Sequence, residues 1–473
     1  MTRIFGHYVP IEMTALWLTE LTLCFALGYI TLNSGIAGPK FNAFDVAAVM
    51  AVSAGMTSFA IGLYRPETFL RLRRLMAKTA VAAVLSFPAI WLAGRLVGID
   101  FARLQGHNAL VPVKMLVSWM VIVLILRLTF SYSLRMNLFT RRIVIVGAGE
   151  GASRTATAIE RLRNGLFEIT GTLRDLHLDT AEKPDPAAAV TPNTAGTSEA
   201  AGIMDQLRRR RVWGVVVAGQ DPRATAVMAA LAHVAGDIRV WGERDFWENQ
   251  LRRVDIDLLC VQPTLSVAID GPAAPGDGRL QALVRRTSDV VLSLVLLAFT
   301  LPLMVLTAIV IRLDSPGPVL YRQERAGLHG HPFVLLKFRS MRLDAEAGGP
   351  TWAAQRDSRV TRVGAFIRST RIDELPQLMN VLRGQMSFIG PRPERPHFVE
   401  QLASVIPAYR QRAEVKPGLT GWAQVNYPYG ASVEDARMKL SYDLYYVTHR
   451  SLVLDVLILF ATVRVILFRE GAR

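Results

Sequence analysis

The sequence predicts a membrane protein of mixed architecture: an N-terminal four-helix transmembrane bundle, an α/β middle domain, and an α-rich C-terminal domain with a re-entrant membrane helix hairpin. Three observations support this prediction. The mean hydropathy is +0.27 and hydrophobic residues make up 51% of the 473 residues, which is typical of membrane proteins. The chain begins with apolar segments of about twenty residues each. Short apolar runs that alternate with helical patterns follow, and the last two fifths open with a further apolar run around a central proline.

The first 135 residues contain the four apolar segments, at about 12–32, 43–64, 78–98 and 112–131. Their charged residues, including Glu20 and Arg127, are expected near segment ends or turned into the bundle, because a charge that faces lipid is costly. Arginines follow the second and fourth segments, and the positive-inside rule places both loops in the cytoplasm. We therefore expect a multi-pass protein whose soluble domains face the cytoplasm.

Residues 141–260 have the alternating pattern of an α/β domain. RRIVIVGAGEGA reads as a strand, a glycine turn and a helix, and FEITGTL, VWGVVVAG and DIRVW read as further strands, so we predict a Rossmann-like unit. Gly147, Gly149 and Gly151 form a turn of the type that binds dinucleotides, with Asp175 near the place of a ribose-binding acid. The same glycines also serve simply to close a strand-helix turn, so a bound nucleotide and a structural turn both stay open. Residues 174–200 read as a loose insertion, and residues 261–280 as a linker.

The apolar run at 288–313 is long enough to span a membrane, yet both of its flanks are basic. If it crossed, one basic domain would lie outside. Pro302 falls at its middle, where it removes a backbone donor, so the helix can break there and return to the side it entered from. We predict a re-entrant hairpin, with a kinked crossing helix as the alternative. The last apolar stretch, 451–468, contains Asp455 and Arg464 and favours an interfacial or packed helix.

The net charge of +15 fits a partner with dense negative charge, such as anionic lipid, a phosphorylated substrate or nucleic acid. No nucleic-acid-binding signature accompanies the charge, so we predict no nucleic-acid partner. The two cysteines, Cys24 and Cys260, lie far apart, which excludes a disulfide framework and a metal site held by cysteines.

Residues 281–473 place single cations between Pro and Gly turns. Arginine presents a planar fork that pairs with two phosphate oxygens at once, so this pattern suits a diphosphate better than a diffuse polyanion. The candidate phosphate-binding residues are Arg322, Arg325, Lys337, Arg339, Arg368, Arg371 and Arg392.

Asp373 and Glu374 are adjacent, and neighbours on a helix point in different directions, so they cannot flank a glycosidic bond as a facing acid and base. Pro376 suits the first turn of a helix, which places the pair near a helix N-terminus. Asp373 could therefore be an N-cap and Glu374 an ordinary first-turn acid. Alternatively, one carboxylate attacks phosphorus while the other holds Mg²⁺, as the surrounding arginines and the membrane hairpin favour.

Residues 285–468 resemble the bacterial sugar transferase family, the polyprenyl glycosylphosphotransferases. The matching blocks are RRTSD, DSPGPVLYRQER, KFRSM, TRVGAFIRSTRIDELPQLMNVLRGQMSFIGPRP and KPGLTGWAQV. The N-terminal spans and the α/β unit are similar to those of the large members that initiate exopolysaccharides. One departure is Leu301-Pro302, where the family usually breaks its hairpin with Ser-Pro. Thr300 is a candidate substitute for that serine.

The resemblance implies a catalytic C-terminal domain in the bacterial inner membrane that transfers a sugar 1-phosphate from a UDP-sugar, glucose or galactose, to undecaprenyl phosphate. It implies that Asp373 attacks the β-phosphate to form a covalent intermediate and that Glu374 holds Mg²⁺. Lys337, Arg368 and Arg392 match positions that the family uses around phosphates, and Asp455 matches an acid in its final helix. The α/β unit would regulate the enzyme or form a homodimer.

Two other functions stay open. A membrane-anchored nucleotide sensor or assembly scaffold would keep this architecture without turnover, and an NAD(P)-dependent oxidoreductase would use the glycine turn. The oxidoreductase is disfavoured because no hydride-transfer pair is recognisable near that turn. Release of UMP from a UDP-sugar, lost in Asp373→Asn, separates the transferase from both.

Overall fold

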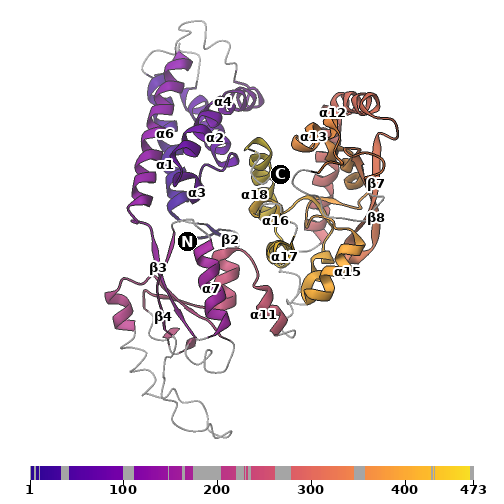
Figure 1. The fold of residues 1–473 in the computed structure, drawn as a ribbon. Helices are drawn as coiled ribbons and strands as arrows, with labels where there is room; N and C mark the ends of the chain where they lie inside the picture. The colour runs from indigo at the N-terminus through magenta and orange to yellow at the C-terminus, as the bar shows by residue number, and fades with distance from the viewer. Residues whose placement is uncertain are drawn as a thin grey trace. The chain divides into compact units, whose positions relative to one another are not determined.

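The computed structural model describes residues 2–4, 7–9, 11–33, 42–99, 111–147, 149–161, 166–173, 204–219, 228–229, 231–232, 236–261, 279–345, 357–427, 430 and 432–468. The chain divides into two compact units, Met1–Leu251 and Arg252–Arg473. In Figure 1 the first is coloured indigo to magenta and the second pink to yellow. The predicted insertion at 174–200, Asp175 and most of the predicted linker at 261–280 lie outside the described residues.

Four long apolar helices dominate the N-terminal part of the first unit, and each is long and apolar enough to cross a membrane. They are α1 (Ile11–Thr31), α2 (Ala43–Ala60), α4 (Leu72–Leu96) and α6 (Val111–Arg135). Helix α2 packs against α1 and α4, and α6 contacts both α1 and α4, as Figure 1 shows. The short elements here are β1 (Thr2–Ile4), β2 (His7–Val9) and α3 (Pro66–Phe69). The chain is therefore a membrane protein, as the sequence predicts.

A buried ion pair joins the first and last of these helices. The Arg127 guanidinium donates from Nε to Glu20 Oε1 at 2.9 Å and from Nη2 to Glu20 Oε2 at 2.7 Å, and Arg127 is fully buried. Arg127 also donates to the hydroxyls of Thr79 and Ser58, and Tyr64 donates to Glu20 Oε2 at 2.6 Å. The prediction that these charges turn into the bundle is confirmed for Glu20 and Arg127.

In the described residues that follow α6 in the first unit, four parallel strands form a sheet in the order β4-β3-β5-β6. The strands alternate their apolar side chains between two faces, so Ile143 and Ile145 pack towards helix α7 while Val144 and Val146 pack on the opposite face. This is the predicted mixed α/β body. Its elements are β3 (Arg141–Val146), α7 (Glu150–Arg161), β4 (Phe167–Leu173), β5 (Gly214–Val217), β6 (Arg239–Gly242), α10 (Glu243–Phe246) and the π-helical turn η2 (Trp247–Leu251).

The second unit opens with α11 (Ile256–Val261) and the 36-residue helix α12 (Arg279–Asp314), which contains Pro302. Straight, such a helix would be about 54 Å long. Side chains on both sides of Pro302 pack on this unit instead: Leu292 lies against its main core, and Ile311 packs with Phe338. The ribbon of α12 in Figure 1 is accordingly bent. The Thr300 hydroxyl donates to the carbonyl of Leu296, a contact that bends helices.

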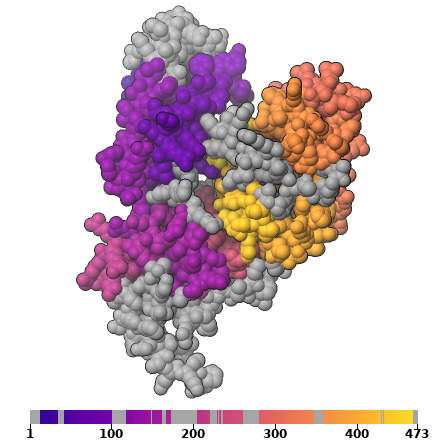
Figure 2. All heavy atoms as spheres, in the orientation of Figure 1, coloured from indigo at the N-terminus to yellow at the C-terminus, as the bar shows by residue number. Residues whose placement is uncertain are grey.

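Small strands and short helices follow α12. They are β7 (Leu320–Ala326), η4 (Leu328–Gly330), β8 (Pro332–Phe338), α13 (Arg362–Ser369), η5 (Ile372–Gln377), α14 (Leu378–Leu382), β9 (Ser387–Ile389), α15 (Pro396–Val405), η6 (Pro407–Glu414), β10 (Gly418–Thr420), α16 (Trp422–Asn426), α17 (Val433–Thr448) and α18 (Leu452–Phe468). Strands β7 and β8 form an antiparallel hairpin, and β9 and β10 a parallel pair. Figure 2 draws the atoms of this unit as spheres, coloured pink to yellow.

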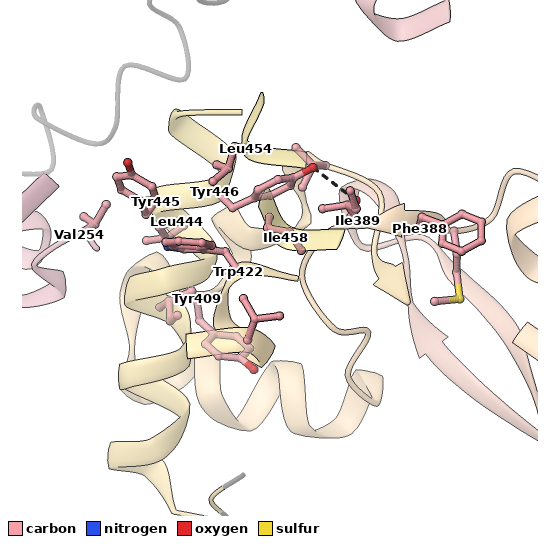
Figure 3. Packing of buried hydrophobic residues seen from close by; sticks show 14 of the residues in the cluster. Val254, Phe388, Ile389, Tyr409, Trp422, Leu444, Tyr445, Tyr446, Leu454 and Ile458 are labelled. Atoms are coloured by element: carbon pink, nitrogen blue, oxygen red, sulfur yellow. Dashed lines mark hydrogen bonds between the residues drawn. The ribbon is translucent and has the colours of Figure 1, made fainter. Parts of the chain in front are cut away.

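The main apolar core of the second unit gathers side chains from several of its helices and strands. Trp422 of α16, Leu444 and Tyr445 of α17 and Tyr409 of η6 belong to it, and Figure 3 shows these side chains gathered together. Val254 belongs to the same core, so the segment before α11 is part of this unit. The core carries the strands and turns on which the candidate site is built.

Candidate active site

Asp373 and Glu374 lie in the 3₁₀ turn η5, between helices α13 and α14. Arg371 precedes them in the left-handed conformation with φ of 62°, which turns the chain sharply at the end of α13. Asp373 does not act as an N-cap, because Arg371 occupies that position and η5 has no side-chain cap. The N-cap interpretation of Asp373 is therefore wrong.

Helix α13 is fixed against the chain that leaves β8. Its N-cap Thr361 accepts a hydrogen bond from the amide of Gly364 at 2.9 Å. A Cβ at position 364 would collide with the carbonyl of Ser340, so only glycine permits this approach. An apolar cluster of Ile311, Phe338 and Ile367 lies beneath, and Ile372 of η5 packs on it. These contacts fix the backbone that carries the carboxylate pair.

Glu374 is bound by two arginines. Its Oε1 accepts from Arg392 Nη2 at 2.6 Å and from Arg371 Nη1 at 3.3 Å. Burial alone would raise the pKa of Glu374, but Arg392, Lys337 and Arg371 outweigh it and hold the pKa below its usual range. Glu374 therefore stays ionised at neutral pH.

Asp373 differs from its neighbour. It is 8% exposed, and neither of its oxygens accepts a hydrogen bond from another described residue. Burial and the charge of Glu374 raise the pKa of Asp373, while Lys337, Arg392 and Arg368 oppose that shift. The pair therefore combines a carboxylate committed to cations with one whose oxygens are free to react.

Lys337 reaches the pair from strand β8, which packs on η5. Asn380 fixes this strand, because its Oδ1 accepts from the amide of Leu336 at 3.0 Å and its Nδ2 donates to the carbonyl of Val334 at 2.7 Å. Burial lowers the pKa of Lys337 to about 8, and Arg392 adds to this effect. Lys337 is thus a cation close to its titration range beside two carboxylates.

The turn that carries Arg392 depends on close backbone contact between β9 and β10. A Cβ on Gly390 would collide with the carbonyl of Lys416, and a Cβ on Gly418 would collide with the amide of Gly390. The glycines of the GPRP and KPG motifs therefore let two chain segments touch. Beyond Gly390, the carbonyl of Arg392 accepts from Arg412 Nη2 at 2.9 Å.

Arg368, Arg322 and Arg339, three further predicted cations, have different surroundings. Arg368 lies near Asp373 and forms no ion pair with another described residue, so its charge is available to a ligand. Arg322 is exposed and pairs with Leu336, on the opposite face of the hairpin from Lys337. Arg339 donates to the carbonyls of Ser315 and Pro316 and so braces the chain after α12.

Arg325 and Asp455 also have protein partners. Arg325 donates to the carbonyl of Pro393 and lies 3.6 Å from Glu394. Asp455 lies in α18, where it accepts from Arg285 at 2.9 Å and from Tyr446 at 2.8 Å. The structure thus brings Asp373, Glu374, Lys337, Arg368, Arg371 and Arg392 together, whereas substrate binding by Arg322, Arg339 and Asp455 stays a prediction.

Sequence reasoning missed the residues that support Arg392. Glu394 and Arg412 both contact this turn, and Asp443 binds Arg412 at 2.7 Å. Glu394 could have been found, because it follows the GPRP motif directly. Asp443 gives no such signal, since it lies on a helix far along the chain.

The carboxylate pair fits a magnesium ion, which typically takes one or two carboxylates together with substrate phosphates. Glu374 is ionised, and its second oxygen, Oε2, accepts no hydrogen bond from another described residue. Among the described residues there is no group of three or more His, Cys, Asp or Glu side chains that could hold a metal alone. A metal here would take its remaining ligands from substrate phosphates and water.

The predicted nucleotide-binding turn, with Gly147, Gly149 and Gly151, lies in the first unit beside a buried acid. A Cβ on Gly151 would lie 2.8 Å from a carboxylate oxygen of buried Glu243, which also accepts from Thr155 at 3.2 Å. Gly147 packs against the carbonyl of Ala218, and Gly149 has φ of 94°. Arg154 Nη2 lies 3.8 Å from Glu243 Oε1, so this acid is paired with a cation, and nucleotide binding here stays a prediction.

Comparison with known proteins agrees with the family that the C-terminal sequence blocks resemble. A family model described as bacterial sugar transferase matches residues 280–469. A UDP-N-acetylgalactosamine-undecaprenyl-phosphate N-acetylgalactosaminephosphotransferase of Aeromonas hydrophila is 43% identical over 257 residues, which cover 54% of this chain and 58% of that protein. An undecaprenyl-phosphate glucose phosphotransferase of Komagataeibacter xylinus is 31% identical over 389 residues, 76% of this chain and 67% of that protein. The exopolysaccharide production protein PSS of Rhizobium leguminosarum bv. phaseoli is 40% identical over 193 residues, 39% of this chain and 95% of that protein. The chain thus spans little more than half the length of the Aeromonas relative.

Proposed function

Because the chain belongs to the bacterial sugar transferase family, we propose that it transfers a sugar 1-phosphate from a UDP-sugar to undecaprenyl phosphate, giving undecaprenyl-diphospho-sugar and UMP. The observation that carries this proposal is the buried carboxylate of Asp373, whose oxygens accept no hydrogen bond from another described residue, beside the arginine-bound Glu374. The names of the relatives support the two substrate classes, and the name of the Rhizobium relative supports a role in priming an exopolysaccharide.

The reaction proceeds in two displacements. An oxygen of Asp373 attacks the β-phosphorus of the UDP-sugar, and the bond from that phosphorus to the bridging oxygen breaks, so that UMP leaves with the electron pair. A phosphate oxygen of undecaprenyl phosphate then attacks the same phosphorus and releases the Asp373 carboxylate. Arg392, Lys337 and Arg368 place positive charge around the phosphoryl oxygens at both steps.

Glu374 would hold Mg²⁺ through its free oxygen, together with the diphosphate of the substrate. When bound, the ion neutralises negative charge on the diphosphate and so favours departure of UMP. Arg392 and Arg371 keep Glu374 ionised for this role.

Purified full-length protein in nanodiscs, supplied with Mg²⁺ and undecaprenyl phosphate, tests the proposal. We expect UMP release with one UDP-sugar of a panel that includes UDP-glucose, UDP-galactose and UDP-N-acetylgalactosamine. The relatives divide between glucose and N-acetylgalactosamine, so the panel identifies the sugar. Absence of UMP with every member of the panel, from folded protein, would favour the scaffold function instead.

We also propose that α12 enters the membrane as a re-entrant hairpin from the cytoplasmic side of the inner membrane. Its exposed side chains are large and apolar on both sides of Pro302, including Phe299 and Leu313, each 81% exposed. Lipid would cover these side chains. A return at Pro302 keeps the basic residues at both ends of α12 in the cytoplasm and sets the carboxylate pair at headgroup level, where a soluble UDP-sugar and a lipid phosphate can meet.

Cysteine labelling tests this topology. In a variant with Cys24 and Cys260 replaced by serine, cysteines are introduced singly at Ala282 and Asp314, which are exposed near the two ends of α12. We expect a membrane-impermeant maleimide to label both positions in inside-out vesicles and neither in right-side-out vesicles. A crossing helix would give opposite labelling at the two positions.

A further inference from the structure

We propose that Asp443 is a positioning residue for the transfer reaction: it holds Arg412, which fixes the main chain of Arg392 and thereby the contact between Arg392 and Glu374. The inference rests on the proposed function and deepens it. Asp443 lies in α17 and Arg412 in η6, and neither element carries a residue of the candidate phosphate site.

The contacts form one continuous series. Asp443 Oδ2 lies 2.7 Å from Arg412 Nη2, and the same nitrogen donates to the carbonyl of Arg392 at 2.9 Å. Arg392 then donates from Nη2 to Glu374 Oε1 at 2.6 Å. A single guanidinium thus joins the acid of α17 to the turn that carries the cation bound to Glu374.

The geometry of Arg412 is fixed from a second direction. Its Nη1 donates to the hydroxyl of Tyr409 at 2.7 Å, and Tyr409 is 2% exposed within the main core. Figure 3 shows Tyr409 together with Leu444, the neighbour of Asp443, in this core. With both terminal guanidinium nitrogens, Nη1 and Nη2, held by buried groups, Arg412 has little freedom to follow a displaced Arg392.

Because Asp443 is buried and Arg412 is mostly buried, loss of the Asp443 charge should strongly affect the position of Arg412. Asp443 is 2% exposed, and the Arg412 side chain is 11% exposed. Replacing one partner of such a pair leaves the other as an uncompensated buried charge, so Arg412 must move or draw in water. Movement of Arg412 releases the Arg392 carbonyl, and the Arg392 side chain then loses its fixed approach to Glu374.

The test compares Asp443→Asn with wild-type protein in the UMP-release assay. Supporting groups of this kind typically affect activity by about 10-fold to 100-fold when they are removed. We expect kcat to fall within that range while KM for the UDP-sugar changes less than about threefold, because Arg392 and Glu374 act mainly on the transition state. Ser441→Ala is the matched control: Ser441 is buried in the same helix but donates to the carbonyl of Val254. Its kcat and KM should equal those of wild type, whatever its melting temperature.

A double substitution tests the route through Arg412. If Asp443 acts only by holding Arg412, then Asp443→Asn should lower kcat less than about twofold further in an Arg412→Met background. Wild-type kcat in folded Asp443→Asn, or full additivity of the two substitutions, would overturn the inference while leaving the proposed function intact. Failure of the wild-type protein to release UMP would instead overturn the proposed function.

Discussion

Asp373→Asn is expected to reduce the rate of UMP release by at least about 1,000-fold while leaving the protein folded. The amide has nearly the shape of the carboxylate but cannot attack phosphorus. Because the Asp373 oxygens accept no hydrogen bond from another described residue, the substitution removes no such contact within the unit. It also removes a like charge beside Glu374, so the melting temperature should not fall. UMP release and thermal unfolding, measured on the same preparation, check both expectations.

Labelling with UDP-sugar in the absence of undecaprenyl phosphate separates a covalent role of Asp373 from an electrostatic one. Wild-type protein should retain the labelled sugar phosphate on a peptide that contains Asp373, and Asp373→Asn should retain none. Glu400→Gln, at an exposed position of α15, removes one negative charge from the same unit and should label as wild type does. Transfer to lipid without label on Asp373 would show that the reaction is a direct displacement.

The central residues of the site could be predicted because they lie in compact motifs. Asp373, Glu374 and Arg392 belong to one block of sequence, and the Gly-Pro-Arg-Pro motif around Arg392 indicates a tight turn even before its partner strand is known. The face of the hairpin was harder to predict. In the structure Tyr321 lies opposite Lys337, so the next residue, Arg322, lies on the other face of the hairpin. This assignment requires the register between β7 and β8, which the sequence alone does not give.

Contacts between distant parts of the chain could not be predicted from the sequence. The acid of α18, Asp455, is occupied by Arg285 at the start of α12, and Val254 joins the core of the second unit. Both contacts join residues that are far apart in the sequence. Such contacts produce no hydrophobic periodicity within a short segment, so the sequence alone does not predict them. By contrast, the membrane helices follow directly from length and hydropathy, because a bilayer imposes both on any spanning segment.

Arg127→Leu is expected to destabilise the protein by about 3–5 kcal/mol, the cost of leaving Glu20 as an unpaired charge in a buried, apolar setting. Glu20→Leu should have a similar effect, because among the described residues Arg127 would then keep the hydroxyls of Thr79 and Ser58 as hydrogen-bond acceptors but no acid. Arg95→Leu is the matched control. It removes an arginine from α4 whose side chain is exposed beside Trp91, so its effect should stay within about 0.5 kcal/mol.

The double variant Glu20→Leu/Arg127→Leu decides whether the pair stabilises the fold or only fixes which helices meet. Replacing both members of a buried pair by apolar residues is often neutral, so the double variant should be more stable than either single variant. Thermal unfolding in one detergent, with the wild-type protein beside the three variants, measures this difference. If the double variant is as unstable as the single ones, then the hydroxyls of Tyr64, Ser58 and Thr79 left without Glu20 and Arg127 cost as much as a buried charge.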